Sequence, residues 1–143
     1  MSLVKIWIHT VWSTKNRKPL LKMDFRQQIY DHILENANKK DILIDCVGGY
    51  LDHIHILLRL RNDQTVSKVL QLIKGESSHW VNNQDFLKEK FEWQKEYFAV
   101  SIGEEDVNRV RGYIQNQYRR HKPKSYQDIY QEFINKYGFE IKG

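Results

Sequence analysis

The chain has 143 residues, of which 41% are hydrophobic and 29% are charged, a balance typical of one soluble globular domain. Its single cysteine, Cys46, excludes a disulfide framework and a cysteine-based zinc site. The net charge of +5 favours an anionic partner, and nucleic acid is the commonest such partner. No apolar run approaches the ~20 residues of a transmembrane helix, and the N-terminus lacks the layout of a secretory signal. We therefore expect a single cytoplasmic domain over residues 1–143 with no membrane partner.

The first third of the sequence predicts a strand followed by a helix. Leu3–Ser13 alternates apolar and polar residues with the period of a strand. The basic segment Thr14–Lys18 is either a solvated turn or a loop that contacts phosphates. Asp24 is a candidate N-cap for a helix that runs to about Lys39. His32 lies off the apolar stripe of this helix, so we expect it to be solvated.

The middle of the sequence predicts a hairpin, a helix and a further strand. The expected elements are a strand at Ile42–Val47 that ends or bulges at Gly48-Gly49, and a strand within Leu51–Leu60. They are followed by a helix capped by Thr65 that continues towards Trp80, a loop or short helix over residues 82–92, and a strand over Trp93–Ile102.

Two helices are expected at the end of the sequence. Apolar residues at helical spacing predict the first over Asp106–His121. Ser125 and Asp128 resemble a capping box for a last helix, which is expected to end at Tyr137 with Gly138 as its left-handed terminal residue.

The order β-α-β-β-α-β predicts an α+β fold of the ferredoxin-like, split βαβ type. We expect an antiparallel sheet with two helices on one face and a free opposite face. The helix over Asp106–His121 could cover that second face and bring side chains to it.

Two histidines on the strand within Leu51–Leu60 are candidates for chemistry. His53 and His55 alternate with apolar residues, so both point to one side of the strand, about 6–7 Å apart along it. This spacing allows both imidazoles to bind one divalent metal ion. A third ligand must come from elsewhere, and an isolated His-x-His pattern also occurs on solvated strands.

Five motifs, in order along the chain, resemble the single-tyrosine HUH transposases of small single-strand insertion sequences and their relatives associated with repetitive extragenic palindromes (REP). The motifs are Val11-Trp-Ser-Thr-Lys-Asn-Arg-Lys-Pro, Asp52-His-Ile-His-Ile-Leu-Leu, Lys74-Gly-Glu-Ser-Ser, Tyr113-Ile-Gln-Asn-Gln117 and Ser125-Tyr-Gln-Asp. The resemblance covers about residues 3–138. It implies that His53, His55 and Gln117 hold Mg²⁺ or Mn²⁺, although ligand softness alone favours zinc.

The resemblance also implies a reaction and partners. Tyr113 is the implied nucleophile, which cleaves single-stranded DNA at hairpin ends and rejoins it through a 5′-phosphotyrosine link. A homodimer is implied, although some members act as monomers, and no small-molecule cofactor is implied. Where the family often has two adjacent histidines, this chain has Arg120 and His121. The candidate DNA contacts are Lys15, Arg17, Lys18, Lys74, Arg119 and Arg120.

Two other functions stay open at this point. A ferredoxin-like sheet also serves non-catalytic single-stranded nucleic-acid-binding modules, which bind without metal through aromatic side chains on the open face. A small metal hydrolase is the other alternative, in which Tyr113 is incidental, water releases the product and no covalent adduct forms.

Overall fold

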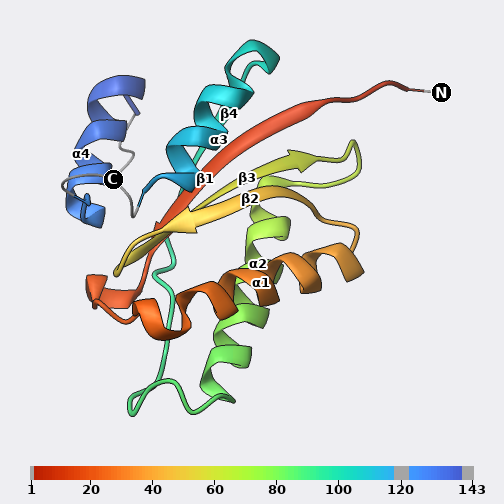
Figure 1. Ribbon diagram of the computed structural model, residues 1–143. Helices are drawn as coiled ribbons and strands as arrows, with labels where there is room; N and C mark the ends of the chain where they lie inside the picture. Colours follow the sequence, from red (N-terminus) through yellow and green to blue (C-terminus); the bar gives the residue numbers. More distant parts are fainter. Residues whose placement is uncertain (1, 118–122, 140–143) are drawn as a thin grey trace.

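The computed structural model describes residues 2–117 and 123–139, and its centre is a four-stranded antiparallel sheet (Figure 1). The strand order is β2-β3-β1-β4, which confirms the predicted ferredoxin-like α+β fold. The strands are β1 (Ile6–Ser13), β2 (Leu43–Gly49), β3 (His53–Leu60) and β4 (Phe98–Ile102).

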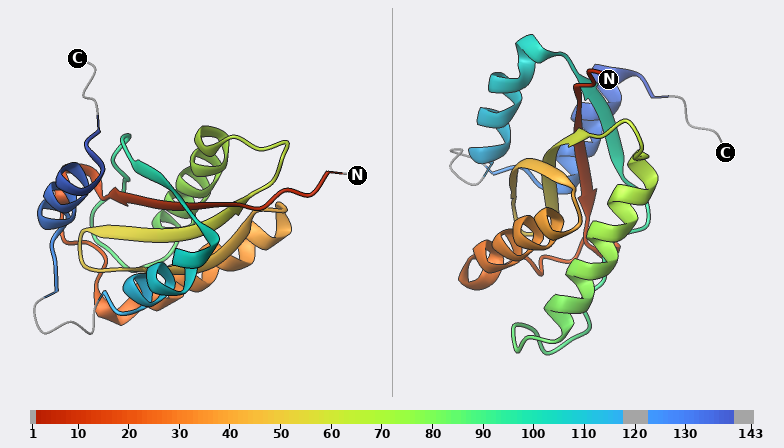
Figure 2. Two further views of the ribbon diagram at one scale, coloured as in Figure 1. Left: turned by 90° about the horizontal axis from the view of Figure 1, so that it is seen from above. Right: turned by 90° about the vertical axis from the view of Figure 1, so that its right-hand side faces the viewer.

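Helices cover both faces of the sheet. Helices α1 (Met23–Lys39) and α2 (Val66–Asn82) lie on one face, as expected. Helices α3 (Val107–Gln115) and α4 (Tyr126–Tyr137) lie on the other (Figures 1 and 2). The tyrosine-bearing helix was expected there, whereas the cover from α4 was not. The described chain also contains two short 3₁₀ turns, η1 (Lys15–Arg17) and η2 (Glu104–Asp106).

Side-chain alternation along β1 and β3 divides the interior into two layers. One face of these strands carries apolar residues that pack against α1 and α2, namely Ile8, Trp12, Ile54, Ile56 and Leu58. Full burial of such a side chain stabilises a fold by about 1.5–3 kcal/mol. The opposite face of β3 carries His53 and His55, so the larger core holds the strand in a register that turns both imidazoles towards α3 and α4.

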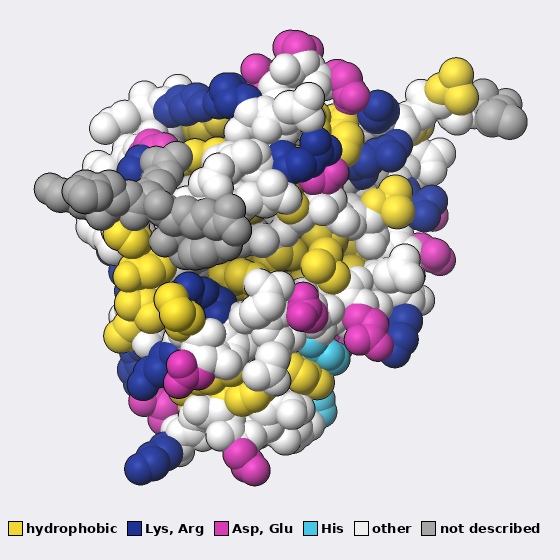
Figure 3. Space-filling view, in the orientation of Figure 1, with side chains coloured by type: hydrophobic (Ala, Val, Ile, Leu, Met, Phe, Trp, Pro, Cys, Tyr) yellow, Lys and Arg dark blue, Asp and Glu magenta, His cyan; other side chains and the backbone are white. Residues whose placement is uncertain are grey.

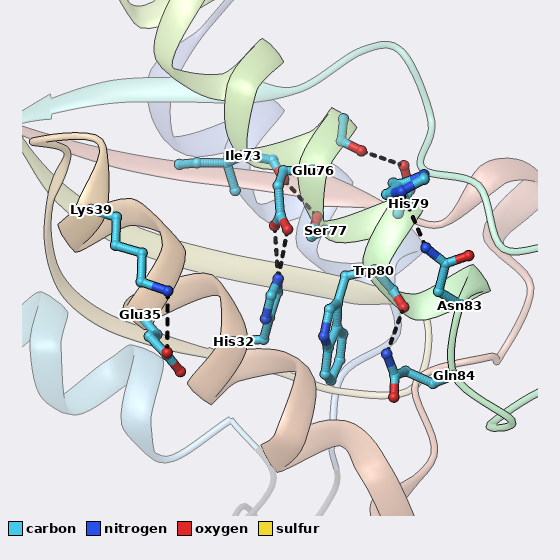
Figure 4. Close-up of polar contacts among 12 residues, drawn as sticks. His32, Glu35, Lys39, Ile73, Glu76, Ser77, His79, Trp80, Asn83 and Gln84 are labelled. Carbon is cyan, nitrogen blue, oxygen red and sulfur yellow. Dashed lines mark hydrogen bonds and ion pairs between the residues drawn. The ribbon is translucent and has the colours of Figure 1, made fainter.

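Helices α1 and α2 are joined by a polar contact that corrects one expectation. His32 is half-buried rather than solvated, and its Nε2 lies 2.7 and 2.9 Å from the two carboxylate oxygens of Glu76 (Figure 4). Its ring stacks on Trp80 with 4.2 Å between the ring centroids. The helical periodicity of α1 could not reveal a partner that α2 supplies.

Several predicted boundaries are wrong by a few residues. Helix α1 begins at Met23 after Lys22, so Asp24 lies within its first turn instead of capping it. Strand β4 begins only at Phe98, and Trp93 makes an isolated bridge with Thr14. The capping box at the start of α4 and the left-handed Gly138 at its end are confirmed. No helix in the described residues is long and apolar enough to cross a membrane.

Candidate active site

Strand β3 places both predicted histidines in the interior between the sheet and the second helical layer. His53 and His55 are each 0% exposed. Their ring centroids lie 5.1 Å apart, and the ring planes cross at 75°. The two imidazoles therefore approach each other in a region screened from water, where electrostatic interactions are stronger than at the surface.

Each histidine is oriented through its Nδ1 atom. The Nδ1 of His53 lies 2.8 Å from Oδ1 of Asp52, and the Nδ1 of His55 lies 3.0 Å from Nε2 of His9 on β1. Burial, followed by the positive charge of Lys136, lowers the pKa of His9 from 6.5 to about 4. His9 is therefore neutral at pH 7, and its Nε2 can accept the Nδ1 proton of His55. Acceptors placed in this way keep the proton of each imidazole on Nδ1, which leaves the lone pair of Nε2 available to a metal ion.

Helix α3 reaches the sheet because β2 carries a glycine at the point of contact. A Cβ atom on Gly48 would lie 2.2 Å from the carbonyl oxygen of Ile114, so only glycine fits there. Gly48 is also the cross-strand partner of His55, which puts the end of α3 beside the histidine pair.

An ion pair also holds α3 against β2. Arg111 donates from Nε and Nη2 to the two carboxylate oxygens of Asp45 at 2.7 and 2.8 Å. These hydrogen bonds hold the pKa of Asp45 below its ordinary value, so the carboxylate stays ionised at neutral pH.

Tyr113 lies beside the histidines. Its ring meets the ring of His55 edge to face with 5.6 Å between the centroids. Its hydroxyl donates a hydrogen bond to Oε1 of Glu132 on α4 at 3.2 Å. The structure therefore brings the predicted nucleophile to the predicted metal ligand His55.

Gln117 lies in the turn after α3, so the prediction of one helix through His121 is wrong. The helix ends at Gln115 because Asn116 leaves helical geometry, with φ −102° and ψ 12°. The Nε2 atom of Gln117 donates to the carbonyl oxygen of Tyr113 at 3.2 Å, so the two residues remain linked.

The polar atoms at this site fit a metal ion. Gln117 is 0% exposed, and its Oε1 and the Nε2 of His53 are buried with no hydrogen-bond partner among the described residues. A buried polar atom without a partner is costly, and a bound cation would supply one. Over residues 2–117 and 123–139, no group of three or more His, Cys, Asp or Glu side chains is arranged to hold a metal ion. The amide oxygen of Gln117 is therefore the candidate third ligand among the described residues.

The sequence did not predict a functional role for three residues of this site: His9, Asp52 and Glu132. The carboxylate of Asp52 also accepts the backbone N–H of Tyr126, at 3.1 Å to each oxygen, and thereby joins the start of α4 to His53. Strand alternation put His9 on one face of β1, but only the pairing of β1 with β3 brings it to His55. Nothing in the sequence alone indicated Glu132.

Comparison with known proteins identifies the family. A family model described as "Transposase IS200 like" matches residues 2–117. The chain belongs to the IS200-like transposase family. This confirms the family indicated by the five motifs, and the match ends before α4. No curated protein matches the sequence.

Two solved structures share the transposase fold. One is a candidate transposase from Deinococcus radiodurans R1, with a TM-score of 0.62 and 20% identity over 81% of this chain and 93% of that chain. The other is a REP-associated tyrosine transposase bound to a REP hairpin, with a TM-score of 0.61 and 21% identity over 87% of this chain and 76% of that chain.

The predicted DNA contacts of this transposase are dispersed. Lys15 and Lys18 form ion pairs with Glu92 and Glu89, both at 3.0 Å. The guanidinium of Arg17 lies over the rings of Tyr126 and Tyr130 on α4, at 5.3 and 5.7 Å. Arg119 and Arg120 lie outside the described residues, as does His121. On the face shown in Figure 3, Lys and Arg side chains are interspersed with Asp and Glu side chains and form no single basic patch.

A cleft of about 1280 Å³ runs between α2 and the segment before β4, and Lys15, Arg17 and Lys74 are among the residues that line it. Lys74 donates to the carbonyl oxygen of Lys95 at 2.8 Å, and its ammonium lies 5.8 Å from the centroid of the Tyr97 ring. Burial lowers the pKa of Lys74. The cleft thus combines cations with an exposed aromatic ring.

Proposed function

We propose that this transposase cleaves and rejoins single-stranded DNA at hairpin ends, with Tyr113 as nucleophile and a divalent metal ion held by His53, His55 and Gln117. The observation that best supports this proposal is the position of Tyr113. Its ring packs against His55, and its carbonyl oxygen accepts a hydrogen bond from the side chain of Gln117. Family membership supports strand transfer as the reaction, since the matched residues include all four of these side chains.

The metal site would use three neutral ligands. A bound Mg²⁺ or Mn²⁺ would polarise the scissile phosphate and stabilise the charge that develops on its oxygens. Two imidazoles and an amide leave the full positive charge of the ion available to the anionic phosphate. Asp52 and His9 would keep both imidazoles in the tautomer that ligation requires.

The reaction would proceed in two transfers. The hydroxyl oxygen of Tyr113 attacks the scissile phosphorus, which breaks the bond to the 3′ oxygen and leaves a 5′-phosphotyrosine link. A 3′-hydroxyl from another end then attacks that link and releases Tyr113. Because the phosphotyrosine ester conserves the energy of the broken bond, no ATP is required.

The basic cleft lies along α2, on the face of the sheet opposite the histidine pair, and Arg17, which lines it, also packs on Tyr126 of α4. We propose the cleft as a path for DNA that extends away from the cleavage site. The ion pairs of Lys15 and Lys18 are exposed, and such pairs contribute little stability, so both lysines can exchange their carboxylates for phosphates. Lys74 beside Tyr97 offers a cation next to a stacking surface, the combination that single strands use. The hairpin held by the REP-associated neighbour supports hairpin ends as the substrate class.

Three further expectations belong to this proposal: a homodimer, a cytoplasmic location and a single domain over residues 1–143. Light scattering on the purified protein tests the first, because it reports the mass of the particle in solution.

A covalent-adduct assay tests the function. The protein is incubated with Mn²⁺ and labelled, hairpin-bearing single strands from its own genomic flanks, and the products are separated under denaturing conditions. The same assay is run with Tyr113→Phe, with His53→Gln, with EDTA, and with Tyr137→Phe as a matched control at an exposed tyrosine. We expect the adduct with the wild type and Tyr137→Phe only.

Two results would contradict this function. DNA binding without any adduct would instead favour a non-catalytic nucleic-acid-binding module. Cleavage that persists in Tyr113→Phe without an adduct would favour a metal hydrolase.

A further inference from the structure

The hydroxyl of Tyr113 is held by a segment that lies outside the residues matched by the family model. Glu132 accepts its hydrogen bond at 3.2 Å from α4, whereas the family match ends at Gln117. A phenol has an ordinary pKa of about 10, so it attacks phosphorus well only if a neighbouring group takes its proton. The carboxylate of Glu132 is in hydrogen-bond contact with that proton.

The position of Glu132 is fixed from several sides. Its second carboxylate oxygen pairs with Lys124, which orients the carboxylate. The start of α4 is held by the capping box between Ser125 and Asp128 and by the bond from Tyr126 N to Asp52. Contacts among the described residues therefore hold Glu132 within reach of the Tyr113 hydroxyl.

Two histidines and a lysine among the described residues near this hydroxyl are less suited to take its proton. The rings of His9 and His55 meet Tyr113 edge to face, at centroid distances of 6.1 and 5.6 Å, which is packing geometry. Their mutual hydrogen bond already engages Nε2 of His9 and Nδ1 of His55. The ammonium of Lys124 is a donor and cannot accept a proton.

We propose that Glu132 is a catalytic residue that accepts the hydroxyl proton of Tyr113 during strand cleavage. The inference rests on the function proposed above. As the Tyr113 oxygen bonds to phosphorus, its proton moves to the Glu132 carboxylate, and the departing 3′ oxygen takes a proton from water. In rejoining, an incoming 3′-hydroxyl attacks phosphorus and loses its proton to water, while the released phenolate recovers a proton from Glu132.

Two substitutions of Glu132 separate proton transfer from simple positioning. Glu132→Gln keeps the length and a hydrogen-bond acceptor but cannot take a proton, whereas Glu132→Asp keeps a carboxylate on a shorter side chain. The side chain is 34% exposed, so neither change disturbs the core. Glu35→Gln is the matched control, because Glu35 is an exposed glutamate of α1 on the opposite face of the sheet.

The rate of adduct formation in a single turnover is measured with saturating hairpin DNA and Mn²⁺, together with DNA affinity and circular dichroism. We expect Glu132→Gln to be slower than the wild type by about 100-fold or more, the usual loss when a general base is removed. Glu132→Asp should be faster than Glu132→Gln, and Glu35→Gln should equal the wild type. All variants should bind DNA equally well.

The outcomes distinguish the two proposals. If the wild type forms the adduct and the rate of Glu132→Gln equals or exceeds that of Glu132→Asp, Glu132 does not accept the proton. This inference is then overturned, whereas the proposed function stands. If the wild type forms no adduct, the proposed function fails and this inference fails with it.

Discussion

Replacing His9 by phenylalanine should weaken metal binding at the histidine pair while the protein stays folded. His9 is 3% exposed and bonds to the Nδ1 of His55. A phenyl ring preserves the packing that His9 makes edge to face with Tyr113 and Phe133, at 6.1 and 5.4 Å. It removes the acceptor that holds His55 in the ligating tautomer, so the substitution separates the polar role of the His9 ring from its packing.

The size of the effect follows from this one contact. Loss of a partner that orients a metal ligand commonly costs about 10–100-fold in metal affinity. That range equals about 1.4–2.8 kcal/mol of binding free energy. The buried Nδ1–H of His55 would also lose its acceptor, which should lower the free energy of unfolding by about 1–3 kcal/mol. A folded domain of ordinary stability tolerates this loss.

Titration calorimetry with Mn²⁺ at pH 7 measures the affinity, and urea denaturation without metal measures the stability. His9→Gln should recover most of the metal affinity, because its amide oxygen can replace Nε2 as acceptor. Phe133→Leu is the control, since Phe133 packs on His9 but accepts no hydrogen bond from a histidine. Wild-type Mn²⁺ affinity in folded His9→Phe would refute the role of His9.

Two further predictions concern the contacts around α4. Asp52→Ala should lower Mn²⁺ affinity at least about tenfold and destabilise the fold by about 2 kcal/mol, because it leaves His53 Nδ1 and Tyr126 N without their acceptor. Calorimetry measures the affinity and urea denaturation measures the stability; an unchanged Mn²⁺ affinity would count against this role of Asp52. Ser125→Ala should cost about 1 kcal/mol of stability by removing the capping box, and Ser125→Asp should retain most of it; equal urea midpoints for wild type and Ser125→Ala would contradict this.

Local patterns sufficed for the elements that carry the site. The alternation in β3 predicted two histidines on the face opposite the core, because a strand buried on one face fixes its register. The capping box and Gly138 predicted the ends of α4, since both signals act through hydrogen bonds within a few residues. The family motifs indicated Tyr113 and Gln117, which the structure places together.

The errors arose where distant segments decide the structure. The apolar stripe of α3 gave no sign that the helix ends at Gln115, since the turn that follows keeps Gln117 buried. His32 looked solvated because its partners, Glu76 and Trp80, come from another helix. His9 meets His55 only through strand pairing between β1 and β3.

The position of α4 explains why a chain of this family uses residues beyond the family match. Asp52 joins a predicted metal ligand to the first turn of α4, and Glu132 joins the second turn of the same helix to the predicted nucleophile. One short helix therefore holds both the His53 side and the Tyr113 side of the site. The distance along α4 between Tyr126 and Glu132 helps to set where the Tyr113 hydroxyl lies relative to His53. A change that loosens α4 should affect metal affinity and the cleavage rate together, although no residue of α4 would touch the metal. Helix α4 is thus best regarded as part of the site that it covers.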